Sequence, residues 1–211
     1  MPVAVKMVLV TLHRPRRRLV QLYAGLLLYG ASMALQIRAG LGLDPWDVFH
    51  QGVAEHTGLT FGTVVVITGA VVLLAWVPLR QRPGIGTVSN VFVIGIAVDA
   101  SLGLLPDAGS MPVALAMLLA GVGLNGVASG AYIGAGLGPG PRDGLMTGLV
   151  RRTGGSIRAV RTSIEVTVLA VGVALGGTVG LGTVLYALSI GPLVHVLLPR
   201  FTIPQPVHAA A

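Results

Sequence analysis

A short pattern that contains an aspartate, Gly-x-Gly-x-x-Pro-x-Asp, occurs twice in the chain, at 40–47 and at 136–143. Its proline suits the first turn of a helix, where a missing N–H costs nothing, and its aspartate would stand near the positive end of the helix dipole. Two interpretations can hold together: a pair of well-capped half-helices, or exposed backbone and helix N-termini that line a cavity for a solute or an ion. The candidate substrate- or ion-binding residues are the glycines, prolines and aspartates of the two copies, namely Gly40, Gly42, Pro45, Asp47, Gly136, Gly138, Pro141 and Asp143.

Three further titratable residues lie inside apolar stretches. Asp99 and Glu165 stand deepest in apolar sequence, where a charge is expensive and usually faces a partner or a wet cavity. Asp99 has no basic neighbour in sequence, so it joins the candidates. Glu165 follows Arg161 by four residues, which favours an ordinary ion pair. His195 is the counterpart of Asp99 in the second copy, so the two could form a titratable pair, but a histidine near a helix end is more often interfacial. Glu165 and His195 are therefore secondary candidates.

The elements that must position these residues are membrane helices. Hydrophobic residues make up 54% of the 211 residues, charged residues only 10%, and the mean hydropathy is +0.85, which excludes a soluble domain of this size. Two polar stretches, 47–56 and 143–152, are too short to cross a bilayer and are predicted as interfacial or re-entrant half-helices. Six apolar stretches approach the roughly 20 residues that a spanning helix needs, at 19–37, 61–79, 85–105, 111–133, 162–175 and 181–198.

An internal repeat appears when the chain is compared with itself at an offset of 96 residues. Without a gap, 27 of the 80 positions in 24–103 are identical to their counterparts in 120–199, including glycines and prolines at the breaks. Each unit holds three predicted spans, an odd number, so the second unit enters the membrane from the opposite side. The predicted fold is an all-α integral membrane protein with six transmembrane helices in a 3+3 inverted repeat, which is typical of secondary transporters.

The basic residues predict the orientation. With a cytoplasmic N-terminus, 13 of the 14 Lys and Arg residues fall in cytoplasmic segments and only Arg38 falls outside, so both termini are predicted in the cytoplasm. A cleaved signal peptide would also explain the basic start, but its removal would leave the first unit incomplete. The predicted organisation is a basic cytoplasmic tail, a first membrane repeat, an external loop, a second membrane repeat and a cytoplasmic tail, at 1–18, 19–105, 106–110, 111–200 and 201–211.

Several classes of function lack their signatures in this sequence. The net charge of +7 belongs to residues beside apolar segments rather than to a polar face with aromatic residues, so no nucleic-acid partner is expected. The chain has no cysteine, and its histidines and acidic residues do not have the spacing of metal ligands. No phosphate-binding loop, nucleophile elbow or zinc-protease motif occurs. We therefore expect no enzyme activity, no cofactor and no metal.

Several of these segments resemble the bacterial YczE/YyaS/YitT family of integral membrane proteins, and are closest to its YczE-like members. The resemblance covers roughly residues 19–200 and implies a multi-pass protein of the bacterial plasma membrane. It supplies no catalytic or transport residues. The matching segments are GLGLDPWDVFHQG from Gly40, TGLTFGT from Thr57, QRPGIGTVSN from Gln81, GLGPGPRDGLMTGL from Gly136, RTSIEV from Arg161 and GTVLYALSIGPLVH from Gly182.

The inverted repeat and its broken helices predict a transporter or permease of an unidentified small solute that works by alternating access. The alternative is a non-transporting membrane component that supports a partner, an export complex or envelope regulation. The expected partners are the lipid bilayer, the solute and a possible second copy of the chain.

Overall fold

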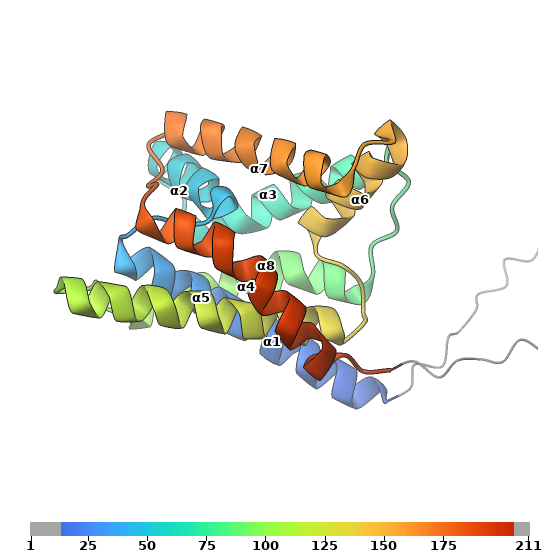
Figure 1. Cartoon of the computed structure of the whole chain (residues 1–211), viewed down its shortest axis with the longest axis horizontal. Helices are drawn as coiled ribbons and strands as arrows, with labels where there is room; N and C mark the ends of the chain where they lie inside the picture. The colour runs from blue at the N-terminus through green and yellow to red at the C-terminus, as the bar shows by residue number, and fades with distance from the viewer. Residues whose placement is uncertain (1–13, 205–211) are drawn as a thin grey trace, which may run out of the picture.

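The computed structural model describes residues 14–204, so most of the predicted N-terminal tail and residues 205–211 of the C-terminal tail lie outside the described residues. Within 14–204 the chain forms eight α-helices and no strand (Figure 1). The helices are α1 (Pro15–Ala39), α2 (Pro45–Thr57), α3 (Phe61–Trp76), α4 (Ile85–Leu104), α5 (Met111–Gly134), α6 (Pro141–Thr153), α7 (Ile157–Ala174) and α8 (Leu181–Phe201).

The two short helices α2 and α6 correspond to the predicted half-helices. Each begins at the proline of its pattern and carries the aspartate of the pattern in its first turn. The chain turns into them through glycines with positive φ, such as Gly42 at 104° and Gly138 at 126°, a region that favours glycine. Asp44 caps α2, since its carboxylate accepts hydrogen bonds from the backbone N–H groups of Trp46 and Asp47.

The helix starts follow the sequence repeat. Helices α5 to α8 begin at 111, 141, 157 and 181, each 96 residues after the start of the corresponding helix in α1 to α4. Contacts between the halves are paired in the same way. The N–H of Gly86 donates to the carbonyl of Leu137 at 2.8 Å, and the N–H of Gly182 donates to the carbonyl of Leu41 at 2.7 Å. The break in each half is therefore held by the first turn of the last helix in the other half.

Four of the helices are long and apolar enough to cross a membrane: α1, α4, α5 and α8. The pair α2 and α3, bent by 114°, counts as a fifth when taken as one broken span. The prediction of six spans also counted α3 and α7 separately. Helix α3 has only 16 residues and α7 carries three charged residues, so neither meets the criterion of length and composition alone. The chain is thus a polytopic helical protein, with four or five candidate spans within residues 14–204.

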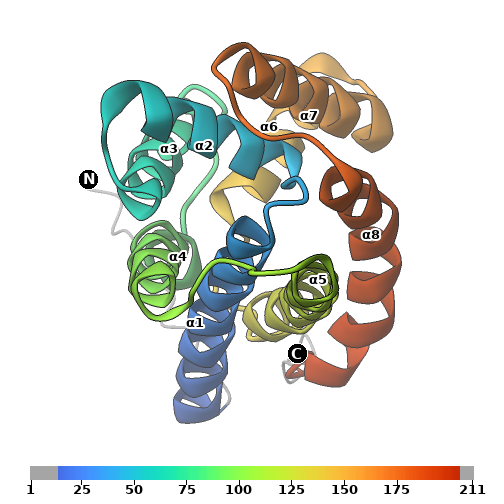
Figure 2. The same cartoon turned by 90° about the vertical axis from the view of Figure 1, so that its left-hand side faces the viewer.

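Helices α1 and α5 form the centre of the bundle, with α4 packed on α1 and α8 packed on α5 (Figure 2). Small residues allow this close approach: a Cβ at Gly25 would lie 2.8 Å from the backbone nitrogen of Tyr132, and one at Gly30 would lie 2.8 Å from that of Val98. The second layer packs across the halves, α2 against α7 and α3 against α6. Helix α3 also packs on α4, whereas α7 makes few contacts with α8.

Candidate functional site

A cavity of about 310 Å³ lies where the tips of α2 and α6 meet. Each of the eight helices of the described chain contributes to its wall. The lining residues of α4 and α7 lie in the first halves of these helices and those of α5 in its second half. These three segments lie toward the end of the bundle where α1 begins and α8 ends (Figure 1). The volume suits a small solute.

Helix α2 and its N-cap bring one carboxyl group and an imidazole, those of Asp44 and His50, to this cavity, and the carboxyl group of Asp47 lies beside it. Asp44 is 4% exposed and Asp47 is 2% exposed. The spacing of three residues places His50 on the face of Asp47, and its Nδ1 lies 3.1 Å from Asp47 Oδ1. The ring of His50 is buried among Trp46, Phe49 and Phe61. The capped tip of the half-helix thus presents carboxylates on a rigid support.

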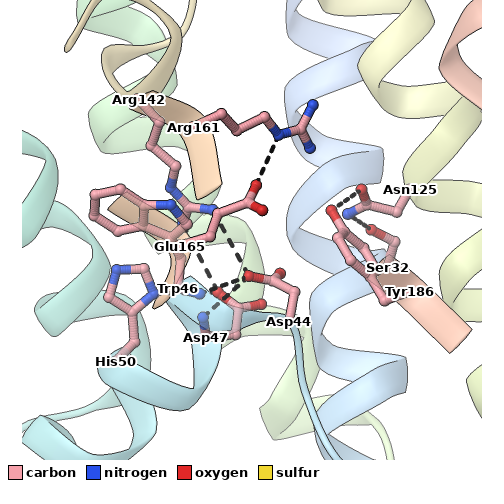
Figure 3. A network of polar contacts seen from close by, with 10 residues as sticks. All are labelled: Ser32, Asp44, Trp46, Asp47, His50, Asn125, Arg142, Arg161, Glu165 and Tyr186. Carbon is pink, nitrogen blue, oxygen red and sulfur yellow. Dashed lines mark hydrogen bonds and ion pairs between the residues drawn. The ribbon is translucent and has the colours of Figure 1, made fainter. Parts of the chain in front are cut away.

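Helix α6 supplies the opposing charge. The guanidinium nitrogens of Arg142 lie 3.8 Å from Asp47 Oδ1 and 4.0 Å from Asp44 Oδ1, and the guanidinium stacks over the ring of Trp46 at 4.8 Å (Figure 3). Trp46 and Arg142 occupy equivalent positions, since 46 + 96 = 142. Both distances are beyond hydrogen-bond length, so the ion pairs are loose. The two halves meet in a cluster of charges to which each contributes a different group.

Asp143, the second predicted aspartate, faces the same cavity from α6. The hydroxyl of Tyr132 donates to its Oδ2 at 3.4 Å, and no basic side chain within 14–204 lies within ion-pair distance of it. Asp47 and Asp143 therefore have different partners despite their equivalent positions: an imidazole and a guanidinium for one, a phenol for the other.

Two neutral polar side chains, Tyr186 and Ser129, line the opposite side of the cavity, and Tyr186 is held by a hydrogen-bonded network behind the wall. The hydroxyl of Tyr186 donates to Asn125 Oδ1 at 3.0 Å, and Asn125 Nδ2 donates to the hydroxyl of Ser32 at 2.9 Å (Figure 3). Ser129, 6% exposed, faces the cavity, and its hydroxyl makes no hydrogen bond among the described residues. These helices therefore offer the hydroxyls of Tyr186 and Ser129 to a bound molecule, and Asn125 and Ser32 fix the position of Tyr186.

The predicted ion pair between Glu165 and Arg161 is present on α7, with Arg161 Nε donating to Glu165 Oε1 at 2.8 Å. Both side chains also line the cavity. They are 36% and 54% exposed, so they stand at its rim. Glu165 is therefore a paired side chain, as its spacing from Arg161 predicted, and it also lies at the candidate site.

Asp99 and His195 lie away from this cavity. Asp99 binds the start of α3: its Oδ1 accepts from the N–H of Gly62 at 2.7 Å and its Oδ2 accepts from the hydroxyl of Thr60 at 2.5 Å. His195 is exposed on α8. Helices α4 and α8 lie on opposite sides of α1 and α5, so the two residues are not brought together (Figure 2).

The candidates of the repeated pattern divide in the same way. Pro45, Pro141 and Asp143 line the cavity, and Asp47 joins the charge cluster beside it. The four glycines Gly40, Gly42, Gly136 and Gly138 form the breaks and do not line it. No group of three side chains that could hold a metal ion occurs among residues 14–204.

Sequence reasoning missed Asp44, His50 and Arg142. Asp44 aligns with Gly140 and His50 with Met146, so a search for residues shared by the two repeats passes over them. Arg142 was counted with the basic residues that set orientation. A search for polar residues beside the breaks that differ between the two repeats could have found them.

Comparisons with known proteins agree on one family. Residues 16–199 match the family described as "Family of unknown function (DUF6198)". The chain is 39% identical to an uncharacterized protein of Haemophilus influenzae over 169 residues, 80% of this chain and 78% of that protein. It is 36% identical to the uncharacterized membrane protein YczE of Bacillus subtilis over 188 residues, 88% and 85% of the two chains. It is 28% identical to YyaS of the same organism over 182 residues, 83% of this chain and 89% of YyaS. No solved structure matches.

Proposed function

The chain belongs to the DUF6198 family as a YczE-like membrane protein, and from this premise we propose that it transports a small solute by alternating access of two inverted repeats. The observation that carries the proposal is the central cavity, where carboxylates of the first half face a guanidinium of the second half. Secondary transporters place their sites where repeats meet and where half-helices end.

The proposed topology has six crossings. Helices α1, α3 and α4 cross in the first repeat and α5, α7 and α8 in the second, while α2 and α6 enter from opposite faces as re-entrant half-helices. The common offset of 96 residues between helix starts supports a duplication. The Lys and Arg distribution supports a cytoplasmic position for both termini.

The charge cluster supports movement between the repeats. Among the described residues of the first half, Arg142 is held through contacts of 3.8–4.0 Å to two carboxylates and through the Trp46 ring. Loose ion pairs between two bodies are suited to change partners when one body moves, because little hydrogen-bond energy is lost. Helix α2 packs on α7, and α3 packs on α6, so a shift of either half-helix is transmitted to a spanning helix of the other repeat.

The uneven packing of the outer helices supports two access routes. Helices α3 and α4 are closely packed, whereas α7 and α8 make few contacts and both line the cavity. In an inverted repeat these two helix pairs are equivalent and face opposite sides of the membrane. The proposed second state is therefore one in which α3 and α4 separate and α7 and α8 close.

The direct test compares metabolites inside and outside cells that carry the protein, that lack it, or that carry the double variant Asp47→Asn, Asp143→Asn. We expect at least one metabolite to change its distribution in the presence of the protein and to return to the level of the lacking strain in the double variant. The control is Asp107→Asn, an exposed aspartate paired with Arg38 outside the cavity.

Two outcomes would overturn the proposal. One is that no metabolite changes its distribution although the protein is present in the membrane. The other is that a partner protein co-purifies in a fixed ratio and the double variant behaves like the unaltered protein. The second outcome would favour the alternative, a membrane component that supports a partner.

A further inference from the structure

We infer that the central cavity binds a monovalent organic cation, a protonated or quaternary amine with an apolar body. The inference rests on the proposed function, for which it names the substrate class. It starts from the charges at the tips of α2 and α6, which are three carboxyl groups, those of Asp44, Asp47 and Asp143, and one guanidinium, that of Arg142, which lies near the first two. The cluster carries two negative charges in excess when all four groups are ionised. A buried excess of charge is costly in a membrane, and a cation offsets it.

Other charges near the cavity leave a negative excess in place. His50, whose Nδ1 lies 3.1 Å from Asp47 Oδ1, adds one positive charge when it is protonated, and one negative charge then still remains in excess. Arg161 at the rim is already matched by Glu165 at 2.8 Å, so the pair contributes no net charge. An anion at Arg142 would approach two carboxylates that already lie within 4.0 Å of its guanidinium. The repulsion from these carboxylates makes an anionic ligand the less favourable occupant.

Asp44 has an oxygen available for a ligand. Its Oδ1 accepts both backbone hydrogen bonds of the α2 cap and faces Arg142, whereas its Oδ2 has no donor among residues 14–204. Asp44 lines the cavity and is 4% exposed, so this oxygen is shielded from bulk solvent. An ammonium placed there would form a charge-assisted hydrogen bond, which is stronger than a neutral one.

The walls of the cavity suit an organic cation rather than a bare ion. Tyr29, Tyr132 and Tyr186 line it, and the rings of Tyr29 and Tyr132 meet edge to face with centroids 6.0 Å apart. Aromatic faces attract cations and pack against apolar bodies. Trp46 already demonstrates this preference, since it holds the guanidinium of Arg142 at 4.8 Å.

Ser129 provides a second, independent sign of a ligand. Its hydroxyl is in a residue that is 6% exposed, it faces the cavity from α5, and it makes no hydrogen bond within the described part of the chain. Because this hydroxyl opens to the cavity and not to another group of the described chain, a ligand or water in the cavity would supply its hydrogen bond. Asn90 on α4, also in the cavity wall, likewise makes no hydrogen bond among the described residues.

The geometry also gives the ligand a way to act on the protein. Arg142 is the resident cation of the first-half carboxylates, and an incoming ammonium would compete with it for Asp44. Because Arg142 is attached to α6 and the carboxylates to α2, displacement of the guanidinium loosens the contact between the half-helices. Binding of the cation is thereby coupled to the movement of the repeats.

The test uses three probes of matched shape and different charge: 2-phenylethylammonium, 2-phenylethanol and 3-phenylpropanoate. Each is titrated onto the full-length protein in detergent, and binding is measured as the shift of the thermal unfolding midpoint and by calorimetry. We expect a saturable shift for the ammonium alone. In Asp44→Asn the affinity should fall by roughly tenfold or more, because a buried charge partner is removed. Asparagine remains a good N-cap, so the variant should keep its fold.

The control Asp107→Asn should bind the ammonium as the unaltered protein does. The inference is overturned if the ammonium does not shift the unfolding midpoint of the unaltered protein, or if it shifts that of Asp44→Asn equally. It is also overturned if 3-phenylpropanoate binds and Arg142→Gln abolishes that binding. Failure here is distinct from failure of the proposed function. If the ammonium binds but the protein has no effect on metabolite distribution, the cation site is supported and the transport function is refuted. If a solute is transported but the ammonium does not bind, the transport function is supported and the cation site is refuted.

Discussion

The helix pairs α3–α4 and α7–α8 occupy equivalent places in the two halves, yet the first is closed and the second is open toward the cavity. In the closed pair, a Cβ at Gly62 would overlap the carbonyl oxygen of Gly95. The residue equivalent to Gly62 is Arg158, and the glycine equivalent to Gly95, Gly191, has nothing within 4 Å of its Cβ position. The duplicated halves keep the same helix starts while their contact residues have diverged.

A second difference concerns the N-terminus of the outer helix. In the first half Asp99 binds Thr60 and Gly62 and so ties α4 to the start of α3. His195 stands at the equivalent position of the second half and makes no such contact within 14–204. Asp99 thus helps to hold the first pair closed, and the difference shows that equivalent positions in the two halves make different contacts.

The largest effect is expected from filling the glycine contact of the closed pair. In Gly95→Ala the new Cβ would lie 2.6 Å from the carbonyl oxygen of Gly62, so the free energy of unfolding should fall by about 1–3 kcal/mol. The matched control is Gly191→Ala at the equivalent position, where the new Cβ would meet no atom beyond its chain neighbours. Because Gly191 precedes Pro192, the helix propensity of alanine is offset there, and we expect a smaller loss than in Gly95→Ala. Equal unfolding midpoints of the two variants in detergent would contradict the account of the closed pair.

A smaller effect is expected at the tie between α4 and α3. Asp99→Ala removes two acceptors from the start of α3 and should lower the free energy of unfolding by about 1–2 kcal/mol. His195→Ala, the equivalent change in the open pair, should have little effect. Thermal unfolding of both variants checks this, and a similar loss in each would mean that Asp99 does not distinguish the pairs.

The smallest effect is expected at the cap of α2. Asp44→Ala removes the acceptor of two backbone N–H groups and should cost about 1 kcal/mol, whereas Asp44→Asn should cost a few tenths at most. The equivalent helix α6 has Gly140 at its N-cap and no side-chain cap, so no corresponding loss is possible there. If the alanine and asparagine variants unfold at the same temperature, the cap contributes nothing to stability.

The sequence predicted the elements better than the site. Glycine and proline fix backbone geometry locally, so the breaks and the starts of α2 and α6 could be predicted from Pro45, Pro141 and their neighbours. The YczE-like resemblance is confirmed by the family comparisons. The six spans and the inverted topology stay predictions. Arg142 could not be placed, because its contact with Trp46 depends on how the two half-helices meet, which no local pattern encodes.

The most direct test of alternating access measures both helix pairs at once. Since the chain has no cysteine, spin labels can be placed at Ala70 and Phe92 on α3 and α4, and at the equivalent residues Val166 and Leu188 on α7 and α8. Pulsed electron resonance in lipid bilayers then gives the distance distribution of each pair. For α3–α4 the account predicts a major population at a short distance and a minor one at a longer distance. For α7–α8 it predicts a major population at a long distance and a minor one at a shorter distance. The two minor populations should be equal in fraction. A single distance in either pair, or a minor population in only one, would contradict it.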